Sequence, residues 1–130
     1  MKRLIIALFA LAFVLFLFAA CAMKFSPAKD VNADVSVRPL NVEPRQEAVL
    51  IDREDAAQII AYFQDLSDGR DHLCDCTADV CVVIGEQTFY YHSHSGVLSE
   101  TVGGTTNHYY VGDNREAINE ILKQYMTLRP

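Results

Sequence analysis

Three cysteines and a histidine lie within ten residues, in the stretch HLCDCTADVC from His72 to Cys81. Thiolate sulfur and imidazole nitrogen are ligands of zinc and copper, and paired thiols form disulfides. The spacing Cys74-x-Cys76 is tighter than the C-x-x-C pairs of structural zinc sites, and no second pair accompanies it. The stretch therefore leaves three interpretations open: a metal site, a disulfide, and small apolar side chains without a bond.

The metal interpretation gains two histidines from the segment TFYYHSH, Thr88 to His94. Strand alternation places every second side chain of that segment on one face of a sheet. Zinc or copper would be the cofactor in this alternative, and no other cofactor is expected. The candidate ligands are Cys74, Cys76, Cys81, His92 and His94.

The disulfide interpretation requires an oxidising compartment. Either Cys74 or Cys76 would reach Cys81 across a short loop, and the odd number of these thiols leaves one unpaired. Catalysis by a cysteine and a histidine is conceivable, with Asp75, Asp79 or Asp113 orienting the imidazole. No motif with a known mechanism fixes such a geometry, so we predict no enzyme and no catalytic residues.

The amino-terminal segment predicts export. After Lys2 and Arg3, the run from Leu4 to Met23 contains no charged residue, and twenty helical residues span about 30 Å, the thickness of a bilayer core. We therefore expect residues 1–23 to be a signal or transmembrane anchor segment. The remaining chain would lie on the extracytoplasmic side of the cell membrane, with the membrane as one partner.

Phe18-Ala19-Ala20-Cys21 resembles the lipobox of bacterial lipoproteins, in which small residues precede a lipidated cysteine. The resemblance implies that Cys21 carries the lipid. Two alternatives remain open: an uncleaved anchor, and ordinary signal cleavage after Ala22.

Charge excludes one class of partner. The chain has a formal net charge of −6, and the residues after Met23 carry nine basic against 17 acidic side chains, a charge of −8. Such an acidic surface argues against nucleic-acid binding.

Proline divides the next part of the chain. Pro27, Pro39 and Pro44 interrupt residues 24–46, whose apolar residues follow no helical period. We expect an extended linker there, in which alternating valines allow a short edge strand. Residues 47–130 then form one small extracytoplasmic domain.

The domain pattern predicts an α+β fold. Helices are expected after Asp52 and Asp113, and strands at 48–51, 80–84, 88–94 and 105–111, with weaker pairing of VLSET. A turn at Gly85-Glu86 makes a hairpin whose core face carries Val80, Val82, Ile84, Phe89 and Tyr91. We expect an antiparallel sheet of about three or four strands with two amphipathic helices on one face.

Aromatic and imidazole side chains gather on the predicted strands and offer amphipathic contact surface. We therefore predict a binding or interaction module for an unknown protein or small molecule, with a metal-binding or thiol-active protein as the alternative. The candidate binding surface is Tyr90, His92, His94, His108, Tyr109 and Tyr110.

Overall fold

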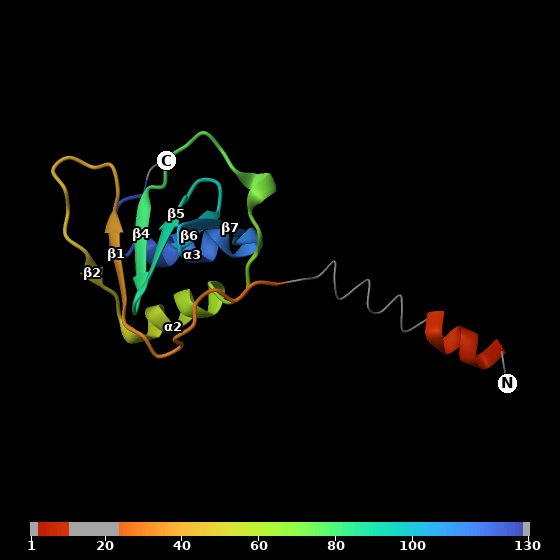
Figure 1. Ribbon diagram of the computed structural model, residues 1–130. Coiled ribbons are helices and arrows are strands. Elements are labelled where there is room, and N and C mark those ends of the chain that lie inside the picture. The colour runs from red at the N-terminus through yellow and green to blue at the C-terminus, as the bar shows by residue number, and fades with distance from the viewer. Residues whose placement is uncertain (1–2, 11–23, 129–130) are drawn as a thin grey trace.

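The computed structural model describes residues 3–10 and 24–128. Its folded part is a seven-stranded antiparallel sheet with strand order β2-β1-β4-β5-β6-β7-β3. Helices α2 and α3 pack against one face of this sheet (Figure 1). The strands are β1 (Val35–Pro39), β2 (Val49–Leu50), β3 (Ser67–Asp68), β4 (Val80–Ile84), β5 (Gln87–Tyr91), β6 (Val97–Val102) and β7 (Thr105–Tyr110). The helices are α2 (Arg53–Tyr62) and α3 (Arg115–Leu122), and short 3₁₀ turns cover Arg70–His72 and Gly112–Asn114.

The hairpin of β4 and β5 forms as its turn residues predict. Ile84 pairs with Gln87, which leaves Gly85 and Glu86 as the two-residue turn. Gly85 has a φ of 59°, a conformation that glycine adopts without steric cost. The predicted core face is confirmed, because Val80, Val82, Ile84, Phe89 and Tyr91 are all buried.

Both helices begin near the acidic residues that predicted them. Asp52 is the N-cap residue of α2, although its side chain makes no capping hydrogen bond, and Asn114 rather than Asp113 is the N-cap of α3. Their apolar stripes join the sheet in one hydrophobic core. The helical contribution to this core is Ala56, Ile59, Ile60, Phe63, Ile118, Ile121 and Leu122.

The expected strand number was wrong. The sheet has seven strands rather than three or four, because β1, β3 and a full-length β6 join it. β6 has the sequence VLSETV and β3 only two residues, so neither shows a strong apolar alternation. Both strands pair with β7. Such long-range pairing cannot be predicted from the pattern of neighbouring residues.

The structure places part of the expected linker inside the sheet. β1 pairs with β2 on one side and with β4 on the other, and Val35 and Val37 are fully buried. Pro39 is the last residue of β1, a position where a missing N–H disturbs the ladder little.

The expected membrane anchor is corrected. Within residues 3–10 and 24–128, no helix is both long enough and apolar enough to cross a membrane. The described helix at the amino terminus covers residues 3–10. The remainder of the predicted segment, with Cys21 and the predicted lipidation, lies outside the described residues.

Candidate functional site

The loop between β3 and β4 crosses the sheet at the ends of its strands (Figure 1). β3 lies at the edge beside β7, whereas β4 lies beyond β6 and β5, so residues 69–79 pass the ends of three strands. At the β7 side, the amide of Gly69 donates to the carbonyl of His108 at 3.0 Å. The His72 ring then stacks on Tyr110 with centroids 3.7 Å apart and planes at 12°. This end of the loop is fixed to β7.

The other end of the loop is fixed to β1. Asn41, directly beyond β1, donates from Nδ2 to Thr77 Oγ1 at 3.2 Å and to the carbonyl of Ala78 at 3.1 Å. The carbonyl of Asp79 accepts the amide of Leu40 at 2.9 Å. The cysteines at 74 and 76 are thus carried on a span attached at both ends.

The ring of His72 in this loop lies against the face of the sheet opposite α2 and α3, which we call the open face. Strand register aligns one row of side chains across that face, from β1 to β7. The row consists of Arg38, Cys81, Tyr90, Ser99 and His108. Tyr110, on which His72 stacks, belongs to the same face because it lies two residues beyond His108.

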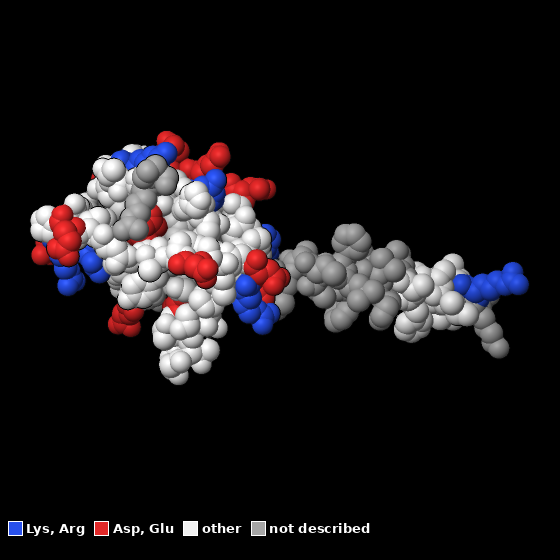
Figure 2. All heavy atoms as spheres, turned by 90° about the horizontal axis from the view of Figure 1, so that it is seen from above, with Lys and Arg blue, Asp and Glu red and all other residues white. Residues whose placement is uncertain are grey.

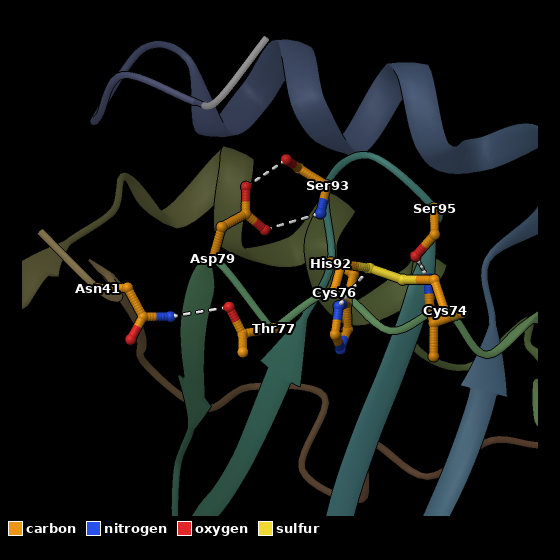
Figure 3. Close-up of a disulfide and its surroundings, with 9 residues drawn as sticks. Asn41, Cys74, Cys76, Thr77, Asp79, His92, Ser93 and Ser95 are labelled. Atoms are coloured by element: carbon orange, nitrogen blue, oxygen red, sulfur yellow. Dashed lines mark hydrogen bonds between the residues drawn. A yellow bond between two sulfur atoms is a disulfide. The ribbon is translucent and has the colours of Figure 1, made fainter.

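Cys74 and Cys76 are joined in a disulfide, with their Cα atoms 5.2 Å apart. Both residues are exposed, and Cys76 Sγ lies 3.6 Å from His92 Nδ1 (Figure 3). A disulfide sulfur has no proton to give, so this hydrogen bond places the proton on His92 Nδ1 and makes the imidazole the donor. One of the two sulfurs therefore has an imidazole partner.

The backbone on the carboxyl side of His92 is held firmly. Asp79 Oδ1 accepts the amide of Ser93 at 2.8 Å, and Asp79 Oδ2 accepts the Ser93 hydroxyl (Figure 3). The carbonyl of Ser93 accepts Asn119 Nδ2 at 2.9 Å, which connects the loop to α3. Asn119 Oδ1 in turn accepts the hydroxyl of Tyr91 at 2.7 Å. Both neighbours of His92 in the chain are thereby tied to one residue of α3.

Burial is the largest cause of the pKa shifts of three groups around the site. It lowers the pKa of His92, and the nearby His108 acts in the same direction while Asp79 opposes both. Burial also raises the pKa of Cys81, which Arg38 partly offsets. The pKa of Tyr91 is raised as well, chiefly because its hydroxyl is buried.

The structure brings together three of the five predicted metal ligands. Among the described residues, the ligand atoms of Cys74, Cys76 and His92 lie within 4.8 Å of one another. Cys81 is a free, buried thiol in the row on the open face, and neither Cys74 nor Cys76 is bonded to it. His94 is exposed and does not belong to the group.

The predicted binding surface divides between the two faces. Tyr90, His108 and Tyr110 lie on the open face, where the Nδ1 atom of His108 is buried without a hydrogen-bond partner in the described structure. Tyr109 lies on the other face, with its ring 5.8 Å from that of Phe25. The surface near the disulfide is thus smaller than the sequence predicts.

Two supporting residues were missed. Sequence patterns named Asp79 as a candidate for orienting an imidazole, but gave no reason to single out Ser93 or Asn119. Ser93 is 3% exposed, so its hydroxyl must be paired, yet a serine beside two histidines looks like an ordinary loop residue.

Two acidic residues lie on the same loop as the cysteines. Asp71 and Asp75 are exposed on the crossing loop, and Asp75 stands between the two cysteines in the chain. Figure 2 shows Asp and Glu side chains interspersed with fewer Lys and Arg side chains on the folded part, in line with its net negative charge. This surface favours cations over anions.

Comparison with protein families, with curated proteins and with solved structures finds no match for this chain.

Proposed function

We propose that this protein is a small binding module rather than an enzyme, and that its site binds a thiophilic transition-metal ion, Zn²⁺ or Cu⁺, through Cys74, Cys76 and His92. The supporting observation is the mutual closeness of three donor atoms, all within 4.8 Å, on a loop attached at both ends. The ion enters the dithiol form of the site, because a disulfide offers no thiolate ligand.

One distance fits zinc closely. Zn–S and Zn–N bonds of about 2.3 and 2.0 Å at a tetrahedral angle separate sulfur and nitrogen by about 3.5 Å. Cys76 Sγ and His92 Nδ1 are 3.6 Å apart, so these two side chains need little movement. Opening the disulfide frees Cys74 as the third ligand. Three protein ligands leave the fourth tetrahedral position to water or another small ligand.

The contacts that hold the chain next to His92 support the same interpretation. Metal-ligating histidines work best when their orientation is fixed by neighbouring groups. Asp79 and Asn119 fix the backbone at Ser93, next to His92. The negative charges of Asp71 and Asp75 add a favourable potential for a cation.

The test is metal titration of the reduced full chain, without a histidine tag and without oxygen. Co²⁺ serves as the spectroscopic probe of a zinc site, Zn²⁺ is measured by equilibrium dialysis, and Cu⁺ by competition with a chromophoric chelator. One Zn²⁺ or Cu⁺ per chain is expected for the parent and for Cys81→Ser. Binding should vanish in Cys74→Ser and Cys76→Ser, and weaken at least ten-fold in His92→Phe.

His94→Phe is the matched control, since His94 lies outside the group of three. Binding that survives both cysteine substitutions would exclude this site, and absence of stoichiometric binding by the reduced parent would exclude the function.

We also propose that the protein lies in an extracytoplasmic, oxidising compartment, where the disulfide is the resting form and must be reduced before the ion binds. The disulfide between Cys74 and Cys76 supports this, because such bonds persist where thiols are not kept reduced. Alkylation of thiols in intact cells, before reduction, should leave both cysteines unlabelled. Full labelling of both would contradict the proposal.

A further inference from the structure

The two sulfurs of the disulfide have different surroundings. Cys76 Sγ accepts a hydrogen bond from His92 Nδ1 at 3.6 Å. Among the described residues, Cys74 Sγ has no polar partner other than the sulfur to which it is bonded. Both residues are exposed, so an outside molecule can reach either sulfur.

We propose a second activity for this loop: thiol–disulfide exchange with thiols of small molecules or of proteins, in which the incoming sulfur bonds to Cys74 and Cys76 is the leaving sulfur. The inference concerns the same residues as the proposed metal site. It does not depend on metal binding, and its test contains no metal, so the two proposals can fail separately.

The exchange proceeds in two balanced steps. A thiolate RS⁻ attacks Cys74 Sγ, the bond between Cys74 and Cys76 breaks, and its electron pair leaves on Cys76 Sγ as a thiolate. A second RS⁻ attacks the outer sulfur of the mixed disulfide, which releases RSSR and the Cys74 thiolate. Two RSH are oxidised to RSSR, the protein disulfide is reduced to two thiols, and the protons of the two RSH end on the cysteines.

His92 determines which sulfur leaves. A hydrogen bond to a charged acceptor is stronger than one to a neutral acceptor, so the contact from Nδ1 strengthens as negative charge develops on Cys76 Sγ. No described group offers the same to Cys74. In the opposite direction, with Cys74 as the leaving group, the negative charge would develop on a sulfur that accepts no hydrogen bond from any described group.

The fold keeps this difference in place. Asp79 and Asn119 hold Ser93, and the amide of His92 donates to the carbonyl of Val97 at 2.8 Å. On the other side, Thr77 is held by Asn41. The imidazole and the cysteine are thus positioned by separate parts of the structure that converge on one contact.

The experiment maps the first adduct. The oxidised full chain carrying Cys81→Ser is treated with limiting 2-mercaptoethanol, quenched with acid and N-ethylmaleimide, and digested at Asp residues. Cleavage before Asp71, Asp75 and Asp79 places Cys74 and Cys76 on separate peptides, 71–74 and 75–78. Mass spectrometry then shows which cysteine carries the mercaptoethanol and which carries the maleimide.

We expect at least a ten-fold excess of mercaptoethanol on Cys74. The excess should fall to near equality in His92→Phe, recover in part in His92→Gln, which restores a donor, and remain in His94→Phe. Equal labelling in the parent, a preference for Cys76, or an unchanged excess in His92→Phe would overturn the inference. The ratio of mercaptoethanol on Cys74 to that on Cys76 in the Cys81→Ser chain decides the direction of exchange by itself, even if a His92 variant fails to fold.

Discussion

Asn119 Nδ2 donates to the carbonyl of Ser93 at 2.9 Å, and Asn119 Oδ1 accepts the hydroxyl of Tyr91, so one side chain of α3 spans the residue that contacts the disulfide. The contact partner of Cys76 therefore depends on a helix packed on the opposite side of the sheet.

Replacing Asn119 with alanine should destabilise the domain. The change leaves the Tyr91 hydroxyl and the Ser93 carbonyl without this partner in a largely buried region, which costs about 1–3 kcal/mol in the free energy of unfolding. Urea denaturation monitored by circular dichroism measures the loss. Glu116→Ala, an exposed position on the same helix, is the control and should change stability by less than about 0.5 kcal/mol. Equal stability of the two variants would show that Asn119 is not a connecting residue.

Reducing the disulfide should leave the domain folded. The bond closes a loop of only three residues, for which chain entropy predicts roughly 1.5 kcal/mol of stabilisation, about half that of a fifteen-residue loop. The hydrogen bonds at Gly69 and Asn41 hold the loop without it. Thermal unfolding of the Cys81→Ser chain with and without a phosphine reductant tests this. Complete unfolding on reduction would contradict it.

Cys81 should be the least reactive cysteine of the reduced, metal-free domain. Burial raises the pKa of its thiol, so at pH 8 less of it is thiolate than of an exposed cysteine, and thiolate is the reactive form. Its alkylation rate should keep rising above pH 9, where an ordinary thiol levels off. Iodoacetamide labelling followed by peptide mass spectrometry gives the rate, and the same chain in urea gives the unburied reference. A folded-state profile that coincides with the urea profile would mean that the thiol is not shielded.

The charge of the incoming thiol should affect the rate of disulfide reduction. Asp75 stands between the two cysteines, so cationic cysteamine should react faster than anionic mercaptoacetate. In Asp75→Asn the ratio of the two rates should fall by about five-fold at low salt. Comparing ratios removes the intrinsic difference between the thiols. Glu86→Gln, in the β4–β5 turn, should keep the parent ratio, and a ratio insensitive to salt would rule out an electrostatic cause.

Gly69→Ala should be far more damaging than Gly103→Ala. A Cβ at Gly69 would lie 2.5 Å from the carbonyl oxygen of Tyr109, whereas a Cβ at Gly103 would meet nothing within 4 Å. Gly103 still has a φ of 59°, so alanine there costs about 1 kcal/mol. We expect at least about 2 kcal/mol at Gly69, together with displacement of the cysteine loop from β7. Chemical denaturation of both variants gives the comparison, and a smaller loss at Gly69 than at Gly103 would refute it.

Local patterns predicted the parts of the fold that local forces decide. The glycine turn at Gly85 and the apolar stripe through Ile59 and Ile60 each carry their own signal in neighbouring residues. β3 consists only of Ser67 and Asp68. It is a strand because its backbone pairs with that of β7. The contact between Cys76 and His92 could not be predicted from local sequence for the same reason. It depends on the path that the chain takes between β3 and β4. The residue types were enough to predict the candidate metal ligands. Which three of them lie close together is determined by the topology of the fold.

The position of β1 inside the sheet affects where the chain can be truncated. A polypeptide starting at residue 47 would lack the neighbour of β4, and the amide and carbonyl groups along VCVVI would form a bare apolar edge. Such an edge recruits other strands, so the shortened protein should self-associate into aggregates instead of remaining monomeric.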